Sequence, residues 1–117
     1  MIQVQEIDTD TLKQWMDDGR RIRIIDVRSP METGRGVIAG SELLPLHLLP
    51  LKMNEVGDEV SSEIPAVFVC RTGARSYQAT AFLTQHGITD VYNLKGGVFD
   101  WVSSGNTLGA PSYSDAA

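Results

Sequence analysis

The stretch from Val67 to Thr80 constrains the fold more than any other, because an apolar run leads through the only cysteine into a helical pattern. The run VFV at positions 67–69 is typical of a strand buried inside a sheet. Gly73 permits the positive φ of a tight loop, and apolar residues at positions 79, 82 and 83 follow at helical spacing. The stretch therefore predicts a strand, a short loop and a helix.

A second run, Arg21 to Val27 (RIRIIDV), begins with alternating residues and ends as a continuous apolar segment. That pattern is typical of a parallel strand covered on both faces. Weaker patterns predict a short strand at 2–5, at an edge or as a lid on the sheet, a strand at 90–94, and helices at 11–18 and 98–103. They also predict a loop at 29–40, a short strand followed by a turn or a one-turn helix at 43–51, and a short helix with a loop at 52–65.

The loop after the central strand has the composition of an anion-binding site. Successive backbone N–H groups in such a loop can face inward, and the following helix adds the positive end of its dipole. Arg71 and Arg75 lie in the same loop as Cys70. These groups favour the thiolate form of cysteine, which is the nucleophilic form. A buried structural cysteine is the alternative for Cys70 alone, but arginines and a glycine this close have no use in core packing.

Composition limits the partners. The net charge of −5 provides no basic field for nucleic acid or an anionic lipid surface. No run reaches the roughly 18 apolar residues of a membrane span, and the chain does not open with a leader-like pattern. A single cysteine excludes an internal disulfide and suits a reducing compartment. We therefore expect a cytoplasmic protein that binds neither nucleic acid nor membrane.

The length of 117 residues fits one domain. We expect the domain to span residues 1–103, and residues 104–117, which are small and polar, to form a flexible C-terminal tail. Neither His47 nor His86 has a second histidine, cysteine or carboxylate pair at metal-ligand spacing, so no metal is expected.

Three ordered segments resemble the rhodanese family of sulfurtransferases. CRTGARS, from Cys70, resembles the active-site loop CxxGxRS of that family. IIDVR, from Ile24, with the glutamate and glycines that follow, resembles its DVR…E…GHIPGA segment, and YNLKGGVFDW, from Tyr92, resembles its C-terminal segment. The histidine and proline of GHIPGA are replaced here by Val37 and Ala39, which affects the loop more than the chemistry.

The resemblance implies an α/β fold, with a small parallel sheet flanked by helices on both faces. It also implies that Cys70 carries sulfur as a persulfide, with no cofactor. Parallel strands would bring Asp26 and Arg28 to the same edge of the sheet as Cys70. The expected substrate-binding residues are Arg71, Thr72, Gly73, Ala74 and Arg75, and the expected supporting residues are Asp26, Arg28, Glu32 and Ser76.

Among these residues, Arg71 is the better candidate for contact with the substrate, since Arg75 can instead brace the loop. Thr72 can donate its hydroxyl to the transferred sulfur. We interpret Asp26, Arg28 and Glu32 as a hydrogen-bonded brace that shapes the loop.

The function that the resemblance implies is transfer of sulfane sulfur from thiosulfate or a persulfide donor to cyanide, a thiol or a redoxin, with a sulfur-carrying protein as a further partner. Two alternatives stay open: a non-catalytic rhodanese-like docking module, and a cysteine-dependent phosphatase or arsenate reductase. The phosphatase loop has five residues between its cysteine and arginine, whereas four separate Cys70 from Arg75, and the chain has no clear general acid.

Overall fold

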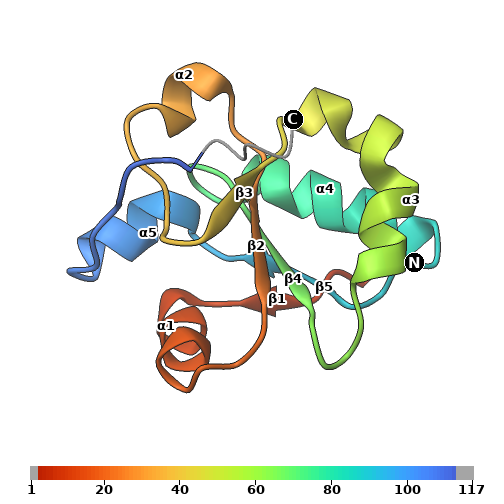
Figure 1. The fold of residues 1–117 in the computed structure, drawn as a ribbon, viewed down its shortest axis with the longest axis horizontal. Coiled ribbons are helices and arrows are strands. Elements are labelled where there is room, and N and C mark those ends of the chain that lie inside the picture. Colours follow the sequence, from red (N-terminus) through yellow and green to blue (C-terminus); the bar gives the residue numbers. More distant parts are fainter. Residues whose placement is uncertain (1–2, 113–117) are drawn as a thin grey trace.

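The computed structural model describes residues 3–112 of the chain, in which strands and helices alternate (Figure 1). In chain order the elements are β1 (Glu6–Ile7), α1 (Thr9–Asp17), β2 (Arg23–Asp26), α2 (Pro30–Thr33), β3 (Ser41–Leu43), a 3-10 turn η1 (Leu46–Leu48), α3 (Leu49–Glu59), β4 (Ala66–Val69), α4 (Ala74–Gln85), β5 (Val91–Leu94) and α5 (Gly97–Ser103).

The five strands form one sheet in the order β1-β5-β4-β2-β3, and every pair is parallel. β4 lies at the centre, where Ile25 of β2 is in register with Phe68 on one side and Tyr92 of β5 with Val67 on the other. Since all strands run the same way, their carboxyl ends meet at one edge. The predicted α/β fold with a parallel sheet is confirmed.

Helices cover both faces of the sheet because side chains alternate along each strand. Ile25 and Phe68 point toward α3 and α4 and pack with Leu83, whereas Ile24 and Val67 pack on the other face with α1 and α5. Figure 1 shows α1 and α5 on one side of the sheet and α3 and α4 on the other. Continuous apolar strands are what a sheet with two covered faces requires.

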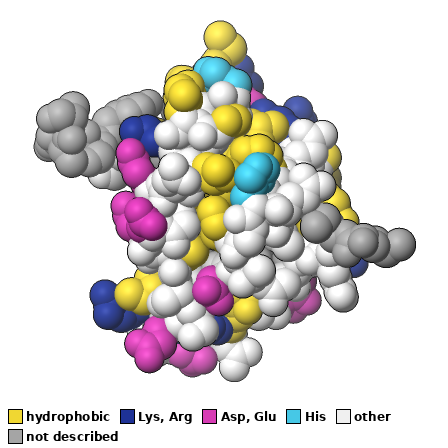
Figure 2. Space-filling model, turned by 90° about the vertical axis from the view of Figure 1, so that its right-hand side faces the viewer, with side chains coloured by type: hydrophobic (Ala, Val, Ile, Leu, Met, Phe, Trp, Pro, Cys, Tyr) yellow, Lys and Arg dark blue, Asp and Glu magenta, His cyan; other side chains and the backbone are white. Residues whose placement is uncertain are grey.

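The outer surface of the α3–α4 layer is mixed in character. Hydrophobic side chains are interspersed with polar ones there, and acidic side chains gather along one border (Figure 2). Glu55, Asp58 and Glu59 of α3 are exposed, and Glu59 forms a salt bridge of 3.1 Å to Arg23. These carboxylates therefore form a solvated face.

A strand was predicted at residues 2–5, but residues 3–5 form no strand, and β1 begins only at Glu6. The prediction was wrong for these residues. The alternation of apolar and polar residues continues to Ile7, which is buried. Glu6 and Ile7 are the residues that pair with β5, so the strand forms there. Positions 1 and 2 of that prediction lie outside the described residues.

The segment 29–40, expected to be a loop, contains the one-turn helix α2. Its start is stabilised by a capping box, in which the Ser29 hydroxyl accepts from the Glu32 N–H and the Glu32 carboxylate accepts from the Ser29 N–H. Pro30 occupies the first helical position, where its missing N–H has no cost. The S-P-x-E pattern was the signal for this turn.

Part of the expected tail lies against the domain. Gly109 and Val37 form an antiparallel bridge, and the Trp101 indole donates to the Thr107 carbonyl at 3.0 Å. Leu108 packs against the core on the α1–α5 side. Residues 113–117 of the tail lie outside the described residues, and the domain boundary at 103 stays a prediction.

Candidate active site

Cys70 directly follows β4 at the carboxyl edge of the sheet, and α4 begins four residues later. Gly73 is the N-cap of α4 and has a φ of 100°, a value that favours glycine. A Cβ at this position would lie 3.1 Å from the Gly96 nitrogen and 3.3 Å from the Leu94 carbonyl oxygen. The tight loop therefore requires glycine here both for conformation and for space.

The Cys70 sulfur has two hydrogen-bond donors beside it, one from the loop and one from the first turn of α4. The Gly73 N–H lies 3.1 Å from Sγ, and the Ser76 hydroxyl lies 3.4 Å from it. Cys70 is only 1% exposed, so a reactant must place an atom inside the loop to reach the sulfur. The twelve-residue helix α4 adds the positive end of its dipole.

These donors decide the charge of the sulfur. Burial raises the pKa of the Cys70 thiol, but hydrogen bonds from the hydroxyl and N–H of Ser76 and from the N–H groups of Gly73 and Thr72 stabilise the thiolate. The stabilising contacts outweigh burial, and the pKa lies below its ordinary value. The site thus favours a buried but anionic sulfur, which is a nucleophile.

Asn93 supports the loop from β5, although our sequence analysis did not single it out. Its side chain is 1% exposed and donates to Glu6 Oε2 at 2.8 Å and to the Gly73 carbonyl at 3.2 Å. Both partners accept only, so the carbonyl end of the amide must face the Ser76 hydroxyl, 2.5 Å away. The sequence feature that could have identified Asn93 is its polar side chain within the otherwise apolar strand VYNL.

The hydroxyl of Ser76 has one proton and two acceptors, the Cys70 sulfur and Asn93 Oδ1. It can donate to only one of them at a time. Asn93 therefore competes with the thiolate for this proton while it also holds the Gly73 carbonyl in place. Ser76, predicted as a supporting residue, contacts the sulfur directly.

Arg75 braces the loop rather than facing its opening. Its guanidinium donates two hydrogen bonds of 2.7 Å to the Glu32 carboxylate, one to each oxygen. This contact is the main cause that lowers the pKa of Glu32 to about 2, and the contacts with Ser29 lower it further. Burial raises the pKa, but by less than the Arg75 contact lowers it. The pair joins α2 to the first turn of α4.

Asp26 and Arg28 form a second, separate brace. Asp26 is fully buried and accepts from Arg28 Nε at 3.0 Å and Nη2 at 2.9 Å, while Nη2 also donates to the Gly36 carbonyl at 2.7 Å. The predicted brace of Asp26, Arg28 and Glu32 is thus divided into two ion pairs, because Glu32 reaches Arg75 instead.

Arg71, Thr72 and Ala74 are the exposed residues of the predicted substrate loop. Within residues 3–112, the Arg71 guanidinium and the Thr72 hydroxyl take part in no salt bridge or side-chain hydrogen bond. Of the two loop arginines, Arg71 is therefore the one whose charge is available to a ligand.

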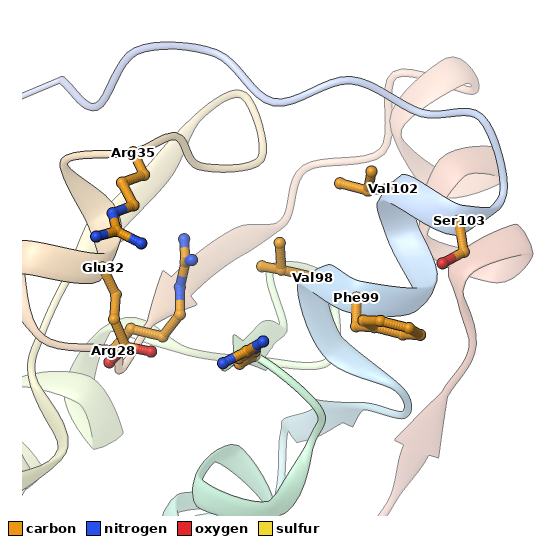
Figure 3. A pocket seen from close by; sticks show the side chains of 8 residues that line it. Arg28, Glu32, Arg35, Val98, Phe99, Val102 and Ser103 are labelled. Carbon is orange, nitrogen blue, oxygen red and sulfur yellow. The ribbon is translucent and has the colours of Figure 1, made fainter.

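A cavity of about 390 Å³, which we call the α5 cavity, opens beside this loop. Figure 3 shows Arg28, Glu32 and Arg35 on one side of it and residues of α5 on the other. Its lining residues are Arg28, Glu32, Arg35, Arg71, Val98, Phe99, Val102 and Ser103.

Helix α5 is attached to the cysteine loop through the backbone. The Val98 N–H donates to the Cys70 carbonyl and the Phe99 N–H to the Arg71 carbonyl, both at 2.9 Å. Gly97 permits this approach, since a Cβ there would lie 2.4 Å from the Cys70 carbonyl oxygen. The wall of the α5 cavity is therefore held in a set position relative to Cys70.

A family model of the rhodanese-like domain matches residues 8–104 of the chain, and these residues include all the site residues described above. The chain belongs to the rhodanese family. The resemblance inferred from the cysteine loop and its two flanking segments is confirmed.

Known sulfurtransferases and a solved rhodanese-like domain are similar to this chain over most of their length. A sulfurtransferase of Allochromatium vinosum is 40% identical over 108 residues, which cover 92% of this chain and 97% of the relative. The thiosulfate sulfurtransferase GlpE of Pseudomonas aeruginosa is 31% identical over 102 residues, covering 85% and 84%. The crystal structure of a rhodanese-like domain protein from Staphylococcus aureus has a TM-score of 0.77 at 30% identity, covering 93% of this chain and 100% of that one.

Among residues 3–112, no group of three His, Cys, Asp or Glu side chains is arranged to hold a metal ion. In the same part of this rhodanese-family chain, no helix is long and apolar enough to cross a membrane.

Replacing Ser76 by alanine tests the hydrogen bonds to sulfur. Ser76→Ala removes a donor that stabilises the thiolate, so we expect the pKa of Cys70 to rise toward its ordinary value. The ultraviolet absorbance of the thiolate, followed against pH, measures this shift. Ser41→Ala is the control, because it removes another buried hydroxyl, one that donates to a carbonyl far from the loop. It should leave the pKa of Cys70 unchanged. An unchanged pKa in Ser76→Ala would contradict the assigned role.

The Glu32–Arg75 pair predicts a dependence of stability on pH. The pKa of Glu32 is lowered from 4.5 to about 2 in the folded protein, so the pair contributes fully above pH 4.5, and this contribution is lost as pH falls toward 2. Glu32→Gln should lower the free energy of unfolding by about 1 kcal/mol at neutral pH, a modest value because about a third of each side chain is exposed. Urea denaturation of both proteins should show this difference shrinking over that pH range. Glu63→Gln, an exposed control, should show no such trend, and a constant difference for Glu32→Gln would count against the pair.

Gly97→Ala and Gly87→Ala form a matched pair that separates backbone strain from contact with the loop. Both glycines have positive φ, 57° and 83°, and alanine costs about 1–2 kcal/mol in that region. Only at Gly97 does the new Cβ meet the Cys70 carbonyl, whereas at Gly87 nothing lies within 4 Å. We expect Gly97→Ala alone to slow alkylation of Cys70 at neutral pH, by about tenfold, since the displaced loop loses its N–H donors to sulfur. Equal alkylation rates in the two variants would show that α5 does not position the loop.

Proposed function

We propose that this protein is a sulfurtransferase in which Cys70 carries sulfane sulfur from thiosulfate or a persulfide donor to cyanide or a thiol acceptor. The observation that supports this most is the buried Cys70 sulfur, which accepts from the Gly73 N–H and the Ser76 hydroxyl and has a lowered pKa. Sulfurtransferases among the relatives point to the same reaction class. Such a reaction requires a sulfur donor and a sulfur acceptor.

In the first half-reaction, the Cys70 thiolate attacks the outer sulfur of thiosulfate. The new bond joins the two sulfurs, the sulfur–sulfur bond of thiosulfate breaks, and sulfite leaves with the electron pair. In the second, the acceptor attacks the outer sulfur of the persulfide, and Cys70 leaves as a thiolate. With cyanide the product is thiocyanate, and no external oxidant or reductant is needed.

The loop supplies binding rather than proton transfer. We expect the N–H groups of residues 71–75 to hold the outer sulfur of the persulfide, with the Thr72 hydroxyl as a further donor. Arg71, whose charge is available, attracts the anionic donor, while Arg75 keeps the loop in shape through Glu32. We assign the protein to a reducing compartment, the cytoplasm, because a persulfide carrier must regain a free thiolate.

Intact-protein mass spectrometry under non-reducing conditions tests the proposal. After incubation with thiosulfate, the wild type should gain the mass of one sulfur atom and lose it on addition of cyanide, and Cys70→Ser should gain nothing. Arg71→Gln should raise the KM for thiosulfate about tenfold, whereas Arg21→Gln, which removes an exposed arginine remote from the loop, should not. A wild-type protein that gains no sulfur would exclude thiosulfate as donor.

A further inference from the structure

The α5 cavity carries an unbalanced positive charge. Of the four charged residues that line it, Arg28 is paired with Asp26 and Glu32 with Arg75. Arg35 and Arg71 form no salt bridge with any residue of the described part of the chain. The cavity therefore favours an anion, even though the whole protein has a net charge of −5.

The opposite wall is apolar and unusually open to solvent. Phe99 is 61% exposed and Val102 is 48% exposed, and Val98 of the same helix also lines the cavity. In Figure 3 these side chains line α5 across from Arg28, Glu32 and Arg35. A large exposed aromatic side chain beside a reactive site is a typical contact for a ligand.

The size of the cavity exceeds the needs of an inorganic substrate. Its volume of about 390 Å³ is within the range of sites for small organic ligands. Thiosulfate or cyanide would leave most of this space to water. The cavity thus has room for an organic body as well as an anionic group.

We propose that the α5 cavity is the acceptor site for a small organic thiol that carries both an anionic group and an apolar body. The anionic group binds Arg35 and Arg71, and the apolar body packs on Phe99 and Val102. This inference rests on the proposed sulfur transfer and adds the class of acceptor and the residues that select it.

The backbone contacts of α5 place such a thiol close to the reacting atoms. The N–H groups of Val98 and Phe99 bond to the carbonyls of Cys70 and Arg71, so the apolar wall and the sulfur move together. The acceptor thiolate attacks the outer sulfur of the Cys70 persulfide, the bond between the two sulfurs of the persulfide breaks, and Cys70 leaves as a thiolate. The persulfide anion formed in the loading step takes a proton from water before this attack. That proton stays on the transferred sulfur, and the product is an organic persulfide.

Three thiols separate the two parts of the site: 4-(mercaptomethyl)benzoate, which is anionic and aromatic, phenylmethanethiol, which is only aromatic, and mercaptoacetate, which is only anionic. Discharge of the persulfide is followed with each thiol and with cyanide, and kcat/KM is corrected for the thiolate fraction. We expect the anionic aromatic thiol to exceed each of the others by about tenfold. Equal kcat/KM values for the three thiols would overturn the proposal and would favour a protein as the occupant of the α5 cavity.

Variants of the cavity walls test the assigned residues. Phe99→Ala and Arg35→Gln should each lower, by about tenfold, the ratio of kcat/KM for the anionic aromatic thiol to that for cyanide. Leu51→Ala and Arg21→Gln, an exposed leucine on α3 and an exposed arginine outside the cavity, are the matched controls and should keep the ratio. Unchanged ratios in both cavity variants would refute the assignment.

Equilibrium binding distinguishes failure of this inference from failure of the proposed function. 4-Methylbenzoate lacks the thiol, and its binding to wild type, followed by NMR titration, requires no sulfur transfer. Saturable binding that Phe99→Ala and Arg35→Gln weaken would support the site even if thiosulfate never loads Cys70. Loading of Cys70 without such binding would support the transfer reaction and overturn the acceptor site.

Discussion

The hydrogen bonds accepted by the Cys70 sulfur are the interaction on which the rest of the site depends. A buried sulfur would normally remain a thiol, because burial disfavours the charged form. Here the loop turns N–H groups toward it, and Ser76 adds a hydroxyl at 3.4 Å. The conformation of Gly73, with a φ of 100°, brings one of these N–H groups to 3.1 Å from the sulfur.

Structure around the loop serves to keep these donors in position. Asn93 holds the Gly73 carbonyl from β5, and the Glu32–Arg75 pair connects the first turn of α4 to α2. The buried pair of Asp26 and Arg28 fixes the neighbouring strand end through the Gly36 carbonyl. Because these contacts come from β2, β5 and α2, the geometry of the loop depends on elements far from it along the chain.

The same contacts explain how an acidic protein can present a cationic site. Ion pairing neutralises Arg28, Glu32 and Arg75, and two further arginines, Arg35 and Arg71, stay available at the cavity. The acidic residues of α3 are exposed, and α3 packs on the opposite face of the sheet from α5. Local charge near Cys70 is therefore independent of the net charge, as expected when water screens distant groups.

Local sequence patterns were sufficient to predict the central strands, the cysteine loop and α4. Apolar runs and the position of Gly73 reflect the backbone preferences of neighbouring residues, which need no distant contact. Local patterns were also sufficient to bring Cys70 and Ser76 together, since the two residues lie on one loop and one helical turn. The role of Cys70 as the nucleophile stays a prediction. Local patterns were insufficient for β1, whose start depends on pairing with β5, and for the contact of Gly109 with Val37.

What the sequence by itself determined is the strand–loop–helix unit around Cys70 and the family to which the chain belongs. Only the tertiary structure decided that Glu32 pairs with Arg75, that Asn93 bonds to Ser76 and Gly73, and that Arg35 and Phe99 line one cavity. The physical reason is the distance along the chain. Forty-three residues separate Glu32 from Arg75, and no local preference encodes a contact that only the packing of α2 against α4 creates.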